Sequence, residues 1–86
     1  MTTRILIVDD EANIRRMVGS LLKSEGFDVA EAPNGNAGLL AIPEVKPDVI
    51  LLDLMMPPGP DGLATLGRIR STDAEIPVIM MSGKAQ

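Results

Sequence analysis

The sequence predicts a single α/β domain built on a parallel sheet, and two observations lead to this. Four short, largely apolar runs recur along the 86-residue chain, each of a length typical of a strand. Between them lie stretches whose apolar residues are spaced as on one face of a helix, so that strand and helix alternate. The four runs are residues 5–8, 27–30, 49–52 and 78–81.

The runs differ in how completely apolar they are. Runs 5–8, 49–52 and 78–81 are continuous, which is typical of strands that are covered on both faces. The run 27–30 contains Asp28, and this more polar character indicates an edge strand. No linker, repeat or low-complexity segment divides the sequence, so residues 1–86 are expected to form one domain.

The first predicted helix follows the run 5–8. Its apolar residues are spaced by three and four positions, as on one face of a helix. Asp10 can cap its start and Gly26 can end it. Its basic residues, Arg15, Arg16 and Lys23, are interpreted as part of a solvated face. The apolar residues that set the pattern are Ile14, Met17, Val18, Leu21 and Leu22.

Two more helices are predicted between the later runs. The second begins near Asn34 and Gly35, and Pro43 should end or kink it early because proline lacks the N–H that a helix interior uses. The third runs from about residue 60 to residue 71, with Pro60 in its first turn. The side chains expected to face inward are Ala37, Leu40 and Ala41 in the second helix and Leu63, Leu66 and Ile69 in the third.

The composition excludes several kinds of site. The net charge of −4 argues against a nucleic-acid-binding surface, and no apolar run approaches the roughly 18 residues that span a membrane. The absence of Cys excludes disulfides and zinc-thiolate sites, and the absence of His removes the commonest general base. The N-terminal residues resemble no signal peptide, so a cytoplasmic protein is expected.

Polar residues gather where the predicted strands end. Asp9 and Asp10 follow the first strand, Asp53 follows the third and Ser82 follows the fourth. If the strand order is 2-1-3-4, the first and third strands are neighbours, and the carboxyl ends of such strands are where parallel sheets place their sites. One interpretation is structural, with Asp10 as a helix cap and Asp53 as the end of a strand. The other is a site for Mg²⁺, which prefers oxygen ligands and would leave one aspartate to attack a phosphoryl group.

Four segments together resemble the receiver domain of two-component response regulators. They read ILIVDDEANIRRM, PDVILLDLMMP, DGL and IPVIMMSG, and they stand in the family's order and spacing over the whole chain. The resemblance implies a flavodoxin-like, doubly wound parallel sheet. For this chain it implies four strands in the order 2-1-3-4 and three helices.

The resemblance also implies roles for individual residues. Asp53 matches the aspartate that accepts a phosphoryl group from a phosphohistidine of a sensor histidine kinase. Asp9 and Asp10 match the acidic pair that holds Mg²⁺, and the backbone carbonyl of Met55 matches a further ligand, so that the metal ligands would be Asp9, Asp10, Asp53 and Met55. Ser82 matches the hydroxyl residue that turns to meet the phosphoryl group and so acts as a switch.

The chain departs from the family pattern in two places. The loop after Asp53 reads Met-Pro-Pro-Gly-Pro-Asp-Gly, one residue more than usual. A full receiver domain also continues into a fourth helix, a fifth strand that carries a lysine, and a fifth helix. The chain is therefore expected to be a receiver domain that lacks its C-terminal third, and Lys84 does not match the family's lysine by position.

A sheet with only three helices is expected to leave part of itself uncovered. Right-handed crossovers put the first helix on one face and the other two on the opposite face. One helix covers about two strands, so the third and fourth strands should expose apolar side chains beside the first helix. We expect a homodimer or larger assembly that buries this face and the edge strand 78–81, with no nucleic-acid or membrane partner.

Three functions stay open at this point. The first is a phosphoacceptor receiver domain, with at most self-phosphorylation and self-dephosphorylation rather than conventional enzyme activity. The second is a non-signalling receiver remnant that acts as a dimerising interaction module. The third is a Mg²⁺-dependent phosphohydrolase of the haloacid dehalogenase class, which needs Asp-x-Asp after the first strand, whereas Asp9 and Asp10 are adjacent and Met55 stands two positions after Asp53.

Overall fold

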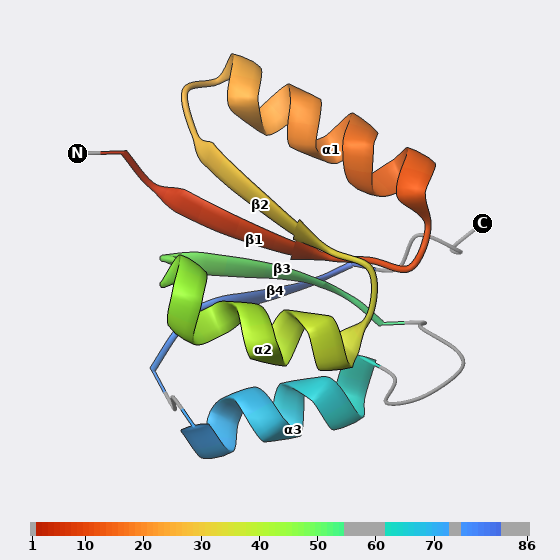
Figure 1. Cartoon of the computed structure of the whole chain (residues 1–86), viewed down its shortest axis with the longest axis vertical. Helices are drawn as coiled ribbons and strands as arrows, with labels where there is room; N and C mark the ends of the chain where they lie inside the picture. The colour runs from red at the N-terminus through yellow and green to blue at the C-terminus, as the bar shows by residue number, and fades with distance from the viewer. Residues whose placement is uncertain (1, 55–61, 73–74, 82–86) are drawn as a thin grey trace.

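A computed structural model of the chain describes residues 2–54, 62–72 and 75–81. Within these ranges the chain alternates between strand and helix, as the sequence predicts (Figure 1). No helix among the described residues is long and apolar enough to cross a membrane. The elements are β1 (Arg4–Val8), α1 (Ala12–Ser24), β2 (Asp28–Ala32), α2 (Gly35–Val45), β3 (Val49–Asp53), α3 (Gly62–Thr72) and β4 (Val78–Met81).

The described strands form one parallel sheet in the order β2-β1-β3-β4, so the predicted order is confirmed. β1 lies between β2 and β3, with Ile5 paired to both Val29 and Val49. The more polar β2 lies at one edge, as its composition indicates, although it runs from Asp28 to Ala32 rather than over residues 27–30. β4 forms the other edge.

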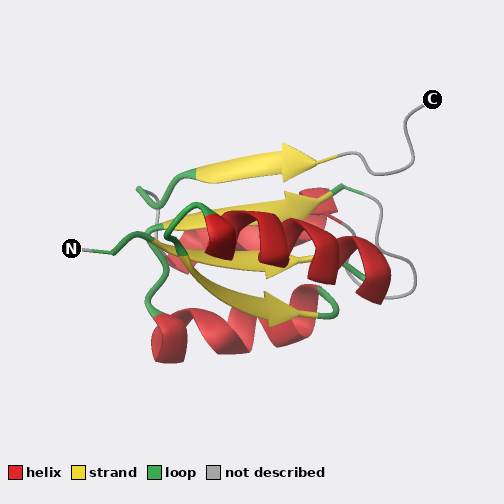
Figure 2. Cartoon of the chain, turned by 90° about the horizontal axis from the view of Figure 1, so that it is seen from above, coloured by secondary structure: helices red, strands yellow, loops and turns green. Residues whose placement is uncertain are grey.

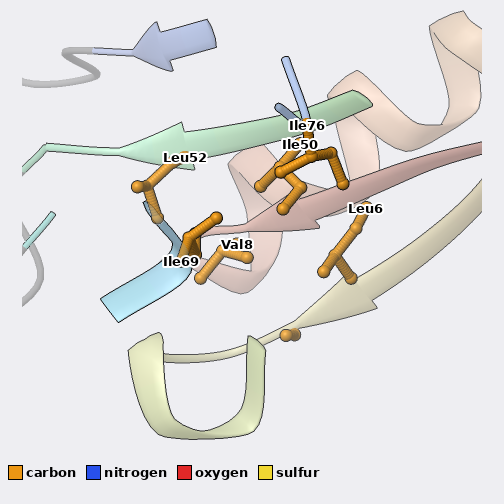
Figure 3. Close-up of a cluster of buried hydrophobic side chains, with 7 residues drawn as sticks. Leu6, Val8, Ile50, Leu52, Ile69 and Ile76 are labelled. Carbon is orange, nitrogen blue, oxygen red and sulfur yellow. The ribbon is translucent and has the colours of Figure 1, made fainter. Parts of the chain in front are cut away.

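The helices cover the two faces of the sheet unequally. Among the described helices, α1 lies alone on one face and α2 and α3 lie on the other, which confirms the assignment made from right-handed crossovers (Figure 1). The core fills the face beneath α2 and α3, where side chains from the central strands meet Ile69 of α3 and Ile76 (Figure 3). The buried members of this cluster are Leu6, Val8, Ala32, Ile50, Leu52, Ile69 and Ile76.

On the α1 side, the strands beyond β1 are less well covered. Figure 2 shows that no described helix crosses the strand β4 on this side of the sheet. Because Ile50 and Leu52 point into the core, the alternation along the strands directs Leu51 and the β4 residue Ile79 toward the α1 side. Ile79 is 54% exposed, as expected for an apolar face that no helix covers.

The predicted inward faces of the helices were partly wrong. Met17 and Leu21 of α1, Leu40 of α2 and Leu63 of α3 are each more than half exposed, from 58% to 75%. The buried positions include glycines, namely Gly19, Gly38 and Gly62, where an added Cβ atom would stand 3.3, 2.8 and 2.4 Å from neighbouring atoms. Residues two positions from Gly19 or Gly38 lie about 200° around the helix and therefore face solvent.

Two predicted helix boundaries were also wrong. The residue that caps α1 is Glu11 rather than Asp10, and the Glu11 side chain makes no capping hydrogen bond. Pro43 does not end α2, which continues to Val45 and stops at Lys46 in a left-handed conformation (φ 53°). Pro43 is tolerated because it lies in the last turn, where its missing N–H costs a single hydrogen bond. Gly26, with φ of 94°, follows the end of α1 as predicted.

Candidate metal and phosphoryl site

The site begins with two buried aspartates at the carboxyl ends of neighbouring strands. β1 and β3 pair with Val8 opposite Leu52, so the next residue of each chain segment, Asp9 and Asp53, stands at the same level of the sheet. Each of these two aspartates is only 2% exposed. The parallel register therefore brings together two carboxylates that are 44 positions apart in the sequence, since 53 − 9 = 44.

Asp10 completes a cluster of three acids. One carboxylate oxygen from each of Asp9, Asp10 and Asp53 lies within 4.8 Å of the others, and Asp10 is the member accessible to solvent. The sequence predicted this grouping. Met55 and Ser82, which the sequence also assigned to the site, lie outside the described residues. The β3–β4 register places Met81 opposite Asp53, and the Leu54 N–H donates to the Met81 carbonyl (2.8 Å).

The Asp9 carboxylate is oriented by the backbone at the start of α1. Its Oδ1 accepts a hydrogen bond from the N–H of Glu11 (2.9 Å), and the N–H of Asp9 donates to the carbonyl of Ala32 on β2 (3.1 Å). The first bond satisfies an N–H at the start of α1 that has no partner within the helix. The acid thus serves the helix terminus and faces the cluster at the same time, so the structural and functional interpretations of these aspartates are compatible.

Sequence reasoning missed Arg15, which was assigned to a solvated face. Its side chain is only 15% exposed. Its Nη1 donates to the backbone carbonyl of Asp9 (2.7 Å) and its Nε donates to Glu31 Oε1 on β2 (3.1 Å). No sequence pattern signalled this role, because the contact joins residues that are 16 positions apart on two different elements.

Gly62 fixes the distance between α3 and the site. A Cβ atom at this position would stand 2.4 Å from the carbonyl oxygen of Asp53 and 2.6 Å from Cα of Leu54, both of them backbone atoms that cannot move aside. The N–H of Gly62 donates to the carbonyl of Leu54 (3.1 Å). The start of α3 can therefore pack against the end of β3 only because residue 62 has no side chain.

The donor set suits a hard divalent cation. The described ligands are all carboxylate oxygens, which Mg²⁺ prefers, and the cluster combines two buried acids with one that is open to solvent. Mg²⁺–oxygen distances are about 2.1 Å, so two ligands on opposite sides of one ion lie about 4.2 Å apart. A separation of up to 4.8 Å fits direct ligation by some of the carboxylates and contact through water by the others.

Comparison with known proteins agrees with this geometry. The sequence profile of the response regulator receiver domain matches residues 5–86. The chain belongs to this family. The receiver domain of a two-component response regulator explains the parallel sheet and the acidic cluster at its carboxyl edge together, and the match sets aside the phosphohydrolase hypothesis.

The relatives of this receiver domain include proteins of greater length. It is 40% identical over 84 residues to the DNA-binding response regulator MtrA of Mycobacterium tuberculosis (strain H37Rv), a match that covers 98% of the chain and 36% of MtrA. The chain therefore spans about a third of the length of this curated relative. The DNA binding named for MtrA is a property of MtrA, which is nearly three times as long as the matched part.

Solved structures show the same fold. The response regulator protein TrrA of Thermotoga maritima, in complex with Mg²⁺ and BeF, superimposes with a TM-score of 0.90 at 34% identity, covering 98% of this receiver domain and 72% of TrrA. A complex of TrrA with the histidine kinase ThkA gives a TM-score of 0.89 at 34% identity, over 99% of this chain and 72% of the matched chain.

Proposed function

We propose that this receiver domain accepts a phosphoryl group on Asp53 in a Mg²⁺-dependent reaction. The observation that carries the proposal is the cluster of Asp9, Asp10 and Asp53, whose carboxylate oxygens converge within 4.8 Å at the carboxyl edge of the sheet. Three acids so close together repel one another unless a cation balances them. The match of the chain to the receiver domain family and the Mg²⁺ bound by the structural relative TrrA also support a Mg²⁺ site at this cluster.

Asp53 is the nucleophile in this proposal. An oxygen of its carboxylate forms a bond to phosphorus, the bond between phosphorus and the donor's imidazole nitrogen breaks, and that nitrogen leaves with the electron pair. Bound Mg²⁺ would supply charge neutralisation for the approaching anionic group. Asp9 and Asp10 would hold the cation, together with the backbone carbonyl of Met55. Ser82 would donate its hydroxyl to the new phosphoryl group.

The phosphodonor that we propose is the phosphohistidine of a sensor histidine kinase in the cytoplasm. The structural relative TrrA has been solved in complex with the histidine kinase ThkA. That complex supports a kinase as the class of partner, and the individual kinase is a matter for experiment.

The decisive experiment is incubation with Mg²⁺ and acetyl phosphate, followed by intact-protein mass spectrometry. We expect one phosphoryl group to be added, and we expect Asp53→Asn, or replacement of Mg²⁺ by a chelator, to abolish the addition. Glu44→Gln, which removes one exposed acid from α2, is the matched control and should be phosphorylated like the parent. A parent protein that stays unmodified at a Mg²⁺ concentration that saturates it would favour the non-signalling remnant.

We also propose that a second copy of the chain covers the exposed side of β4. Ile79 is 54% exposed there, and β4 is an edge of the sheet whose outer backbone groups face away from β3. The edges of two identical strands can pair in antiparallel fashion across a two-fold axis, which makes the surface self-complementary. The homodimer is therefore the assembly that we expect.

A further inference from the structure

Arg15 connects three elements around the acidic cluster. It belongs to α1, it donates to the backbone carbonyl of Asp9 just beyond β1, and it donates to Glu31 on β2 (2.7 and 3.1 Å). Its side chain is 15% exposed, whereas the neighbouring Arg16 is exposed. Two adjacent arginines thus have different environments, and only the first reaches the residues that surround the cluster.

The bond from Arg15 completes the restraint of Asp9. The N–H of Asp9 is held by Ala32, its Oδ1 is held by the N–H of Glu11, and its carbonyl oxygen is held by Arg15. A hydrogen bond from a charged donor is shorter and stronger than one between neutral groups, and 2.7 Å is at the short end of its range. The backbone of Asp9 is therefore held at both its N–H and its carbonyl, and this restrains the peptide that joins Asp9 to Asp10.

The charge of Arg15 would oppose a cation nearby if nothing balanced it. Glu31 provides the balance, because its Oε1 accepts from Arg15 Nε and its side chain is 31% exposed. Glu31 is itself confined on the helix side: a Cβ atom at Gly19 would lie 3.3 Å from Glu31 Oε2 and 3.5 Å from Val29 Cγ1. The pair is packed between α1 and β2, where its geometry is well defined.

We propose that Arg15 is a positioning residue for the metal site and that Glu31 both orients and neutralises it. The proposal rests on the proposed function, in which Asp9, Asp10 and Asp53 bind Mg²⁺. Arg15 does not touch the cation or the phosphoryl group. It holds the backbone from which Asp9 and Asp10 project. Removal of a group that hydrogen-bonds a metal ligand itself typically costs 10- to 100-fold in metal affinity, and we expect the lower end of that range for a bond to the backbone of a ligand residue.

The test measures metal affinity directly, with Mn²⁺ as the probe. Free Mn²⁺ is followed by electron paramagnetic resonance, and Mg²⁺ is then used to displace it. The parent is compared with Arg15→Met, Arg15→Lys, Glu31→Gln and the control Arg16→Met, each checked for folding by circular dichroism. Arg16→Met matches Arg15→Met in charge change and helix position, and it changes an exposed side chain.

We expect Arg15→Met to weaken Mn²⁺ binding by about tenfold, and Arg16→Met to leave it within twofold of the parent. Arg15→Lys should recover part of the loss, because lysine can donate to the Asp9 carbonyl but lacks the planar fork that holds Glu31 as well. The water-proton relaxivity of bound Mn²⁺ should rise in Arg15→Met, because a carboxylate that leaves the ion is replaced by water.

The sign of the effect separates this proposal from simple charge repulsion. If Arg15 acted only as a nearby positive charge, its removal would tighten Mn²⁺ binding, and that result would overturn the proposal, as would a change of less than twofold. If the parent itself fails to bind Mn²⁺ or Mg²⁺, or if Asp53→Asn binds as well as the parent, the proposed function fails instead. Should Arg15→Met not fold, Arg15→Lys provides the comparison, because it keeps the positive charge: a loss of affinity supports the positioning role, and binding equal to that of the parent would overturn it.

Discussion

At the scale of single residues, glycines determine how closely the helices approach the sheet. A Cβ atom at Gly38 of α2 would stand 2.8 Å from Cγ2 of Val8, a buried side chain of the central strand. Gly67 of α3 has nothing within 4 Å of the same hypothetical atom. The same residue type therefore serves packing at one position and only adds conformational freedom at the other.

Gly38→Ala and Gly67→Ala should change stability in opposite directions. Gly38→Ala forces a methyl group against Val8, and we expect the free energy of unfolding to fall by about 1–2 kcal/mol, even after the gain in helix propensity. Gly67→Ala meets no neighbour, and we expect a rise of about 0.5–1 kcal/mol. Urea denaturation of both variants checks this, and a fall for both would show that α3 is packed more tightly around residue 67 than described.

Thr65 is a second residue whose substitution should change the stability of the domain. It is fully buried in α3, and its hydroxyl has no hydrogen-bond partner among the described residues. Burying a hydroxyl without a partner costs about 1–3 kcal/mol. We expect Thr65→Val, which keeps the shape of the side chain, to raise the free energy of unfolding by about 1 kcal/mol in urea denaturation. A loss of stability would mean that the hydroxyl has a partner.

At the scale of elements, the start of α2 is the best-defined helix terminus. Asn34 is its N-cap, and its side-chain oxygen accepts a hydrogen bond from the N–H of Ala37 (2.8 Å). We expect Asn34→Ala to lower the free energy of unfolding by about 1 kcal/mol, and Asn34→Ser to restore most of it. Asn36→Ala, two residues along and exposed, is the control and should be neutral or slightly stabilising. An equal loss for both variants would contradict the capping role.

The strands were predictable from the sequence and the helix faces were not. Continuous apolar runs located β1, β3 and β4, although only β1 and β3 are largely buried and Ile79 of β4 is 54% exposed. Helix orientation depends on which residue approaches the sheet most closely, and a glycine such as Gly38 carries no apolar signal. The outward positions of Leu21 and Leu40 were therefore mistaken for inward ones.

The candidate site divides in the same way. Asp9, Asp10 and Asp53 could be predicted because acids at the ends of adjacent parallel strands must meet at one edge. Arg15 could not, because its role depends on a contact with Glu31 across two elements, which neither spacing nor composition reveals.

At the scale of the whole molecule, the acidic cluster links stability to Mg²⁺. A ligand that binds only the folded state adds about 1.4 kcal/mol at ten times its Kd, which corresponds to a rise in Tm of about 6–11 °C for a domain of this size. We expect that rise with Mg²⁺, and no comparable rise with NaCl at matched ionic strength.

Asp10→Asn should melt at the same temperature or higher without Mg²⁺, because one repulsion is removed, and should lose most of the Mg²⁺-dependent rise. An undiminished rise in Asp10→Asn would exclude that residue from the ligands.

The exposed side of β4 determines the expected state of assembly. We expect the chain to sediment as a dimer at micromolar concentration, and Ile79→Lys to sediment as a monomer, because a charge in the centre of the contact would be buried without a partner. Leu40→Lys, at a position 75% exposed on the opposite side of the sheet, is the matched control and should leave the dimer intact. A parent protein that sediments as a compact monomer would contradict the proposed contact.

The central position of β1 also affects how the domain is synthesised. Ile5 pairs with Val29 on one side and with Val49 on the other, so the second partner lies about 44 residues further along the chain. At about 5–20 residues per second, a ribosome needs about 2–9 s to add that length. The most deeply buried strand of the domain is therefore made first and waits longest for its neighbour, which makes nascent β1 the segment most in need of protection during translation.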